Sequence, residues 1–187
     1  MNTKTKKLST VSMVLCGMFA ALVAIGAFIQ IPVPYMDYFT LQFFFVLLAG
    51  LILGADKGAI SVGCYVLLGL VGVPIFAAGG GIGYIFRPSF GYLIGFIVSA
   101  YITGKVCEKL KASYKNYLLA CLAGFVATYA IGIVYKFIIL NFYAHTPATL
   151  GVIFLSCFPL DMPGDFVLCL LAAGVGLRMR KSGFYLS

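Results

Sequence analysis

The sequence predicts an all-α integral membrane protein with six transmembrane helices. Hydrophobic residues make up 63% of the 187-residue chain and charged residues only 10%, whereas charged residues are about 25% of a typical soluble domain. The mean hydropathy is +1.09, and a soluble domain of this size could not bury so much apolar surface. Because a spanning helix needs about 20 mostly apolar residues, the chain is long enough for six spans joined by short loops in a single domain.

Six apolar segments are the expected spans. They run over residues 8–29, 40–54, 57–72, 88–107, 115–140 and 163–180. The second and third are short for a full crossing, so residues of the preceding loop or local thinning of the bilayer would make up the difference. Between the spans we expect loops, at residues 32–37, 55–58, 73–86, 108–111 and 141–160.

The last of these loops contains a further apolar segment, residues 147–158, which is too short to cross as a helix. Pro159 and Pro163 punctuate its end. We therefore expect a short extra helix or a re-entrant segment before the last span, with Pro163 in the first turn of that span, where its missing N–H group does no harm.

The positions of the basic residues predict the orientation. If the amino terminus is cytoplasmic, all but two of the 13 Lys and Arg residues fall on the cytoplasmic side, and the two exceptions are Arg87 and Lys136. Cytoplasmic loops of membrane proteins carry such an excess. A seventh crossing would place the basic residues 178–181 outside, so we expect both termini on the cytoplasmic side of a bacterial cell membrane. The net charge of +8 reflects these flanking residues and does not indicate nucleic-acid binding.

The six cysteines lie in or next to apolar segments, and none belongs to a CxxC pair. We interpret them as packing residues and expect no disulfide and no metal. The glycine-rich run 79–83 is not a phosphate-binding loop, because G-x-x-x-x-G-K-[ST] is absent, so we expect no ATP site and no cofactor. Glycines in an outer loop allow positive φ and close backbone approach. This run is therefore expected to close over a pocket as a lid, with a plain flexible linker as the alternative.

Three ionisable side chains lie in or beside the outer half of the expected spans. Asp165 is in the first turn of the last span, Lys136 is about one turn from the outer end of the fifth, and Arg87 precedes the fourth. Such groups are expensive in a membrane and mark a functional site by default. Each also has a simpler explanation: helix-terminus stabilisation for Asp165, reaching to the headgroups for Lys136, and lipid phosphate contact for Arg87.

Taken together, the three charges favour a pocket that offers an acceptor to N–H groups and cations to an anionic ligand. The other outer acids, Asp37 and Asp161, are expected to be solvated in loops, and His145 to be a surface histidine.

Small residues follow one face of the first span. Gly17, Ala20, Ala24 and Ala27 recur at steps of three and four, which places them on one side of a helix. Such a stripe allows another helix to approach closely. It is either a docking face for a partner protein in the membrane or a packing face within this chain. The pairs Gly50/Gly54 and Gly91/Gly95 are expected to pack internally.

Residues 32–81, residues 87–96 (RPSFGYLIGF) and residues 163–165 (PGD) resemble the BioY family, biotin-specific S components of energy-coupling factor (ECF) transporters. The similarity covers nearly the whole chain. It implies six helices, biotin as the ligand in the outer half, and a partner module of one transmembrane coupling protein and two cytoplasmic ATPases. In this family group small residues of the first helix contact the coupling protein, and Ala20 and Ala24 match them.

With biotin as the ligand that the resemblance implies, the membrane-buried charges suggest a hypothesis for the roles of the site residues. Asp165 would accept from the ureido N–H groups of biotin, and Lys136 would stand by the carbonyl or the carboxylate. Arg87 and the glycine loop, including Gly81, would close over the remaining polar end. Three residues would line the ring pocket, namely Tyr84, Phe44 and Gln42.

Two departures from the family pattern concern the cations and the fourth span. Many relatives have a Lys three residues after the Asp of the last motif, where this chain has Leu168, and Lys136 would supply that charge instead. Many also read Pro-Thr-Gly-Gly-Tyr where this chain has residues 88–92 (PSFGY).

Two other functions stay open. An S component for riboflavin or thiamine would share the architecture. An intramembrane enzyme could use Asp161, Asp165 and His145, but the chain lacks a paired-histidine motif or a nucleophile beside a base. We therefore expect a binding and translocating subunit rather than an enzyme.

Overall fold

A computed structural model describes residues 9–31, 39–144, 146, 148–157 and 161–183. The helices are α1 (Thr10–Phe28), α2 (Gln42–Leu53), α3 (Ala55–Leu70), α4 (Phe90–Lys109), α5 (Tyr114–Ile138), α6 (Leu150–Cys157) and α7 (Asp161–Lys181). Two short strands, β1 (Gln30–Ile31) and β2 (Phe39–Thr40), pair antiparallel. A 3₁₀ turn, η1, covers Ile82–Phe86, and a π-helical segment, η2, continues α5 over Ile139–Tyr143. The predicted all-α class is confirmed, with the small hairpin as an addition.

A helix lies at each of the six expected spans, with ends within one turn of those expected, and α6 lies where a short extra helix was expected. Four of the described helices are long and apolar enough to cross a membrane: α1, α4, α7, and α5 together with its π-helical extension. The other two are shorter, since α2 has 12 residues and α3 has 16. Length and composition therefore establish a membrane-embedded helical protein with at least these four spans among its described residues.

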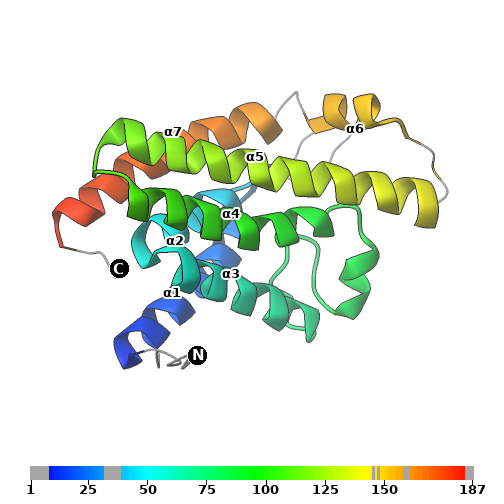
Figure 1. The fold of residues 1–187 in the computed structure, drawn as a ribbon. Helices are drawn as coiled ribbons and strands as arrows, with labels where there is room; N and C mark the ends of the chain where they lie inside the picture. The colour runs from blue at the N-terminus through cyan, green and yellow to red at the C-terminus, as the bar shows by residue number, and fades with distance from the viewer. Residues whose placement is uncertain (1–8, 32–38, 145, 147, 158–160, 184–187) are drawn as a thin grey trace, which may run out of the picture.

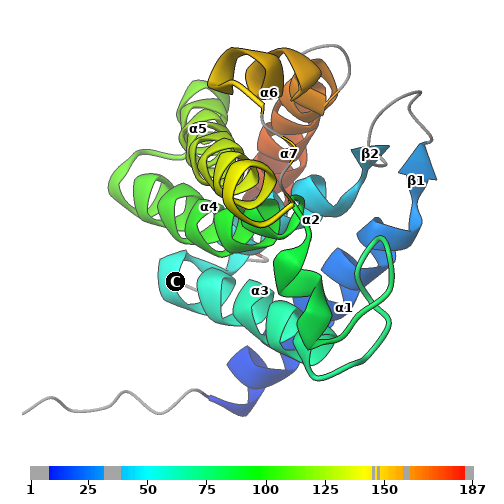
Figure 2. The same ribbon diagram turned by 90° about the vertical axis from the view of Figure 1, so that its right-hand side faces the viewer.

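The helices form an elongated bundle with two distinct ends (Figure 1). The α4–α5 connection and the carboxyl end of α7 lie at one end. The loop between α3 and α4, together with α6, lies at the other, which we call the loop end. Figure 2 looks at the bundle from the loop end and shows the β1–β2 hairpin beside α1 and α6 beside α5 and α7.

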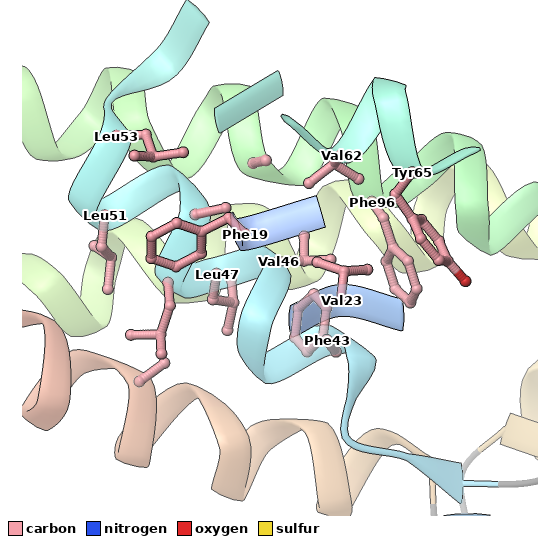
Figure 3. Packing of buried hydrophobic residues seen from close by; sticks show 14 of the residues in the cluster. Phe19, Val23, Phe43, Val46, Leu47, Leu51, Leu53, Val62, Tyr65 and Phe96 are labelled. Atoms are coloured by element: carbon pink, nitrogen blue, oxygen red, sulfur yellow. The ribbon is translucent and has the colours of Figure 1, made fainter. Parts of the chain in front are cut away.

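α2 is the central helix of the bundle. Ten of its 12 residues are buried, and it packs against α1, α3, α4 and α7. A helix that is apolar all round fits only a position surrounded by other helices. Figure 3 shows Leu47 of α2 near Phe19 of α1, and Phe43 of α2 near Val23 of α1. A side-chain atom at Gly50 would meet the backbone of α4 at Ala100, so this glycine packs internally, as expected.

The predicted loop at residues 55–58 is wrong, because α3 begins at Ala55 directly after α2. Gly54 makes the corner alone, with φ of 81°, a left-handed conformation that side chains disfavour. The first free N–H group of α3, at Ala55, donates to Oε1 of Glu108 at 2.8 Å. This bond satisfies a helix-terminal donor and attaches the corner to the end of α4.

Between α3 and α4, the glycine-rich loop is ordered by its own hydrogen bonds. Phe76 and Gly79 form an isolated antiparallel bridge, and the N–H of Gly81 donates to the carbonyl of Gly69 at 2.7 Å. The side chain of Gln30, in β1, donates to the carbonyl of Ala77 at 2.7 Å. The loop is therefore attached both to α3 and to the hairpin after α1.

Candidate functional site

A cavity opens among the helices at the loop end. Its wall is built from the amino-terminal parts of α2, α4 and α7, the carboxyl-terminal half of α5, strand β2, and the loop between α3 and α4. Aromatic side chains line much of it, including Phe43, Phe96 and Tyr92. Phe43 and Phe96 stack with ring centroids 5.9 Å apart. The cavity thus combines an apolar aromatic surface with a few polar groups, as small-molecule sites do.

The three charged residues singled out from the sequence lie on this one cavity. Arg87, Lys136 and Asp165 all line it, although they come from three separate segments. Asp161 joins them, so its expected place in a solvated loop is wrong. α7 begins at Asp161, two residues before Pro163, and residues four apart share a face of a helix. Asp161 and Asp165 therefore lie on the same side of α7, and the cavity wall carries two acids and two basic residues.

Asp165 is held by a tyrosine of the neighbouring helix. The hydroxyl of Tyr129, in α5, donates to Oδ2 of Asp165 at 2.8 Å. Tyr129 is only 5% exposed and packs against the rings of Phe125 and Tyr92, with centroids at 4.7 and 5.8 Å. Asp165 lies in the second turn of α7 rather than the expected first turn. Its carboxylate thus has a side-chain donor, which differs from the helix-terminus role considered from the sequence.

Gly164, next to Asp165, allows a close contact between α7 and β2. A side-chain atom at Gly164 would collide with the ring of Phe39, in β2. The glycine therefore allows β2 to approach α7 next to the carboxylate, and Phe39 itself lines the cavity.

Arg87 lies over an aromatic ring on the wall of the cavity. Its guanidinium carbon is 5.3 Å from the centroid of Tyr84, within the range of a cation–π contact. Tyr84 is buried and packs against Phe76, with centroids 4.6 Å apart. This contact positions the cation over the cavity wall, because Tyr84 is itself a lining residue.

Gln42 belongs to a chain of hydrogen bonds at the start of α2. Its Nε2 donates to the hydroxyl of Tyr65 at 2.6 Å, and that hydroxyl donates to the carbonyl of Ile75 at 3.1 Å. On the other side, the hydroxyl of Thr40 lies 3.4 Å from Oε1 of Gln42. Gln42 and Thr40 both line the cavity, whereas Tyr65 lies behind them in the core.

Two residues expected at the site do not line the cavity. Phe44 packs against Phe45 at the edge of the core, and its neighbour Phe43 faces the cavity instead. Successive helical residues point about 100° apart, so a shift of one residue changes the face. Gly81 is the second exception, because its N–H group is bonded to Gly69 within the loop. It does not present a bare donor, and Ala77 and Ala78 are the loop residues that line the cavity.

Several lining residues were missed from the sequence, and one of them carried a usable signal. Tyr129 precedes Lys136 by two helical turns, so both lie on one face of α5. Ser89, Tyr92 and Phe96 lie within residues 87–96, a stretch that carries the family resemblance, but nothing in its apolar pattern marks these three as lining residues. For Thr40 the local pattern gives no signal. Asp37 and His145 lie outside the described residues.

The small-residue stripe of α1 is mostly turned inward. Ala20 is 7% exposed and Ala27 fully buried, and Ala24 is partly buried against the core. Only Gly17 is exposed, and a side chain there would meet no atom within 4 Å. The stripe therefore serves internal packing along most of its length, and its Gly17 end is open.

The comparison with known proteins agrees with the resemblance drawn from the sequence. The chain is 40% identical over 177 residues to a probable biotin transporter BioY from Lysinibacillus sphaericus, covering 94% of this chain and 90% of that protein. It is 38% identical to a biotin transporter BioY from Thermotoga maritima, covering 88% of this chain and 93% of that one.

A solved structure, the S-component for biotin from an ECF-type ABC transporter, matches the fold with a TM-score of 0.82. Its sequence is 26% identical, and the match covers 99% of this chain and 97% of that one. The model of the BioY family matches residues 1–183. This chain therefore belongs to the BioY family.

Proposed function

We propose that this chain binds biotin and takes it up across the bacterial cell membrane as the substrate-specific subunit of an ECF-type ABC transporter. The observation that supports this most directly is the convergence of Asp165, Lys136 and Arg87 on one aromatic-lined cavity. The relatives named as biotin transporters and the S-component for biotin support the choice of ligand.

The chemistry of biotin suits this cavity. Biotin has a ureido group with two N–H donors and one carbonyl, an apolar thioether ring, and an anionic valerate tail. The carboxylate of Asp165 would accept from a ureido N–H, a charge-assisted bond that is strong in a water-poor site. The rings of Phe43, Phe96 and Tyr92 would contact the apolar part. Lys136 and Arg87 would attract the ureido carbonyl and the valerate carboxylate.

The proposed topology has six crossings, with both termini in the cytoplasm. The basic residues 105–115 and 178–181 flank the bundle end opposite the cavity, as expected for a cytoplasmic side. The short helix α2 would then cross where other helices surround it, whereas α3 would face the bilayer with exposed apolar side chains such as Ile60, Leu67 and Leu68. The cavity would open to the outside, where a scavenged vitamin arrives.

The proposed partners are a transmembrane coupling protein and two cytoplasmic ATPases. The chain has no phosphate-binding motif of its own, so energy would come from the ATPases. Ala20 and Ala24 match the family's contact face on the first helix. Because Ala20 is buried, we expect the coupling protein to approach α1 at its open side, around Gly17 and the partly exposed Ala24.

Identification of the ligand tests this proposal. The detergent-solubilised protein should release unmodified biotin on denaturation, detectable by mass spectrometry, and titration of the emptied protein with biotin should give saturable heat. Riboflavin and thiamine should give none. Recovery of a different vitamin would overturn the choice of ligand, and turnover of the bound molecule would overturn the non-enzymatic role.

A further inference from the structure

The amide of Gln42 has only one orientation that satisfies its neighbours. Its partner, Tyr65, has one hydroxyl proton, and the carbonyl of Ile75 lies 3.1 Å from that hydroxyl. A carbonyl can only accept a hydrogen bond. The proton of Tyr65 is therefore committed to Ile75, and the hydroxyl oxygen must accept from Gln42, 2.6 Å away. Only the NH₂ group of Gln42 can donate, so it faces Tyr65.

This arrangement turns the carbonyl oxygen of Gln42 toward the cavity side. Oε1 lies near the hydroxyl of Thr40, at 3.4 Å, and both residues line the cavity. A carbonyl oxygen has two lone pairs, so it can accept from Thr40 and from one further donor. Gln42 is therefore a directed acceptor on the cavity wall.

The surroundings of Tyr65 prevent the opposite orientation. Tyr65 is fully buried, its ring packs edge-on to Phe76 with centroids 5.5 Å apart, and Figure 3 shows it beside Phe96 in the core. Rotating the amide would point Oε1 at a hydroxyl whose proton is already used. Two acceptors would then face each other at a buried position, and such unsatisfied buried groups are destabilising.

A parallel arrangement holds the other acceptor. Tyr129 donates to Oδ2 of Asp165 from α5, just as Tyr65 fixes Gln42 from α3. The cavity thus has two acceptors on different helices, α2 and α7, and each is hydrogen-bonded to a buried tyrosine. A carboxylate cannot reach both N–H groups of a cyclic urea, because these diverge from opposite sides of the ring.

We propose that Tyr65 is a positioning residue that makes Gln42 a fixed hydrogen-bond acceptor, and that Gln42 selects ligands with an N–H group at that point. This inference rests on the proposed function: Asp165 would take one ureido N–H of biotin, and Gln42 the other. A ligand carrying an acceptor or a methyl group at that position is rejected, because the amide cannot turn to accommodate it.

The test compares biotin with its two isomers methylated at one or the other ureido nitrogen. Each isomer lacks one N–H donor. In the wild type both should bind at least about tenfold more weakly than biotin, the loss expected for a buried hydrogen bond. Gln42→Leu should abolish the discrimination against the isomer methylated at the nitrogen that faces Gln42. The discrimination against the other isomer should remain, because that nitrogen faces Asp165. Tyr65→Phe should reduce the discrimination against the same isomer, since the amide is then free to rotate.

A double variant and a control make the test specific. Gln42→Leu combined with Tyr65→Phe should discriminate no less than Gln42→Leu alone, because the two residues act as one unit. Tyr117→Phe is the control, since Tyr117 is equally buried but accepts from Arg180 at the opposite end of the bundle. It should keep both discrimination ratios of the wild type.

Each other outcome overturns the inference. If both variants lost the same factor in affinity for biotin and for its two methylated isomers, the two residues would support the fold without selecting the ligand. Unchanged ratios in Gln42→Leu would remove Gln42 from the ligand, and a change in Gln42→Leu without one in Tyr65→Phe would remove the positioning role. A wild-type protein that binds no biotin would overturn the proposed function instead, so the two failures are distinguishable.

Discussion

The hydroxyl of Tyr129 and the carboxylate of Asp165 are joined by a 2.8 Å hydrogen bond that links α5 to α7 at the wall of the cavity. The bond fixes one oxygen of the only carboxylate among the sequence-selected site residues. Both helices also pack along much of their length. The Tyr129–Asp165 pair therefore connects the packing of the bundle to the chemistry of the site.

Replacing the carboxylate should weaken biotin binding more than removing its tyrosine partner. Asp165→Asn removes the charge, and we expect a loss of about 1–3 kcal/mol in binding free energy, the cost of leaving a buried hydrogen-bonding group without its partner. Tyr129→Phe leaves the carboxylate in place, so the loss should be smaller. Titration calorimetry of the solubilised variants measures both. Tyr114→Phe is the matched control, because Tyr114 joins the same two helices through an exposed bond to Leu170. Unchanged affinity in Asp165→Asn would remove this residue from the site.

The two cations can be assigned to the ends of biotin by using an uncharged analogue. Arg87→Gln and Lys136→Gln should differ in their effect on biotin and on biotinamide, whose tail carries no charge. One of the two variants lacks the partner of the valerate carboxylate. Its affinity for biotin should fall about tenfold, within the range for a charge-assisted bond, while its affinity for biotinamide should stay nearly unchanged.

Lys109→Gln, at the carboxyl end of α4, is the control for the general effect of removing a positive charge. If neither cavity variant separates the two ligands, the tail of biotin does not contact either cation.

A bulky residue on the open side of α1 should block uptake without affecting binding. Among the described residues, a side-chain atom at Gly17 would meet no other part of the fold within 4 Å, so Gly17→Leu should fold and bind biotin normally. In cells carrying the complete transporter it should abolish biotin uptake, because a coupling protein needs close helix approach. Ala130→Leu, at an exposed position of α5, should keep uptake. Normal uptake in Gly17→Leu would show that α1 does not dock a partner at this point.

Ala20→Leu should behave differently from Gly17→Leu. Ala20 is buried in the core, and inserting extra methylene groups into a packed core costs typically about 1–3 kcal/mol. The thermal midpoint of the solubilised protein should therefore fall, together with binding. A stable Ala20→Leu variant with intact binding and no uptake would instead assign this residue to the docking face.

The glycine loop depends on one contact with α3. A side-chain atom at Gly69 would overlap the ring of Phe76, which packs between Tyr65 and Tyr84. Gly69→Ala should therefore displace the loop, lower the thermal midpoint and weaken biotin binding. Gly63→Ala is the control on the same helix, because a side chain there meets no atom within 4 Å. Equal midpoints for the two variants would show that the loop adjusts without loss.

The sequence by itself determined the class of the protein, the positions of its helices, and the charged residues expected at a functional site. A bilayer imposes one simple condition, long apolar helices with few charges. Whether a segment meets this condition can be judged from its residue types alone, without knowing which residues contact one another in the fold. The same condition makes Asp165, Lys136 and Arg87 conspicuous, because their cost is set by the membrane and not by the fold.

Only the tertiary structure decided which faces and which partners make the site. The rotation of α2 brings Phe43 rather than Phe44 to the cavity, and the start of α7 brings Asp161 to it. Tyr129 meets Asp165 across 36 residues of sequence, and Tyr65 meets Gln42 across 23. Such pairings depend on the phase and crossing of packed helices, which hydropathy does not encode, since an inward and a lipid-facing side chain are equally apolar in a membrane protein.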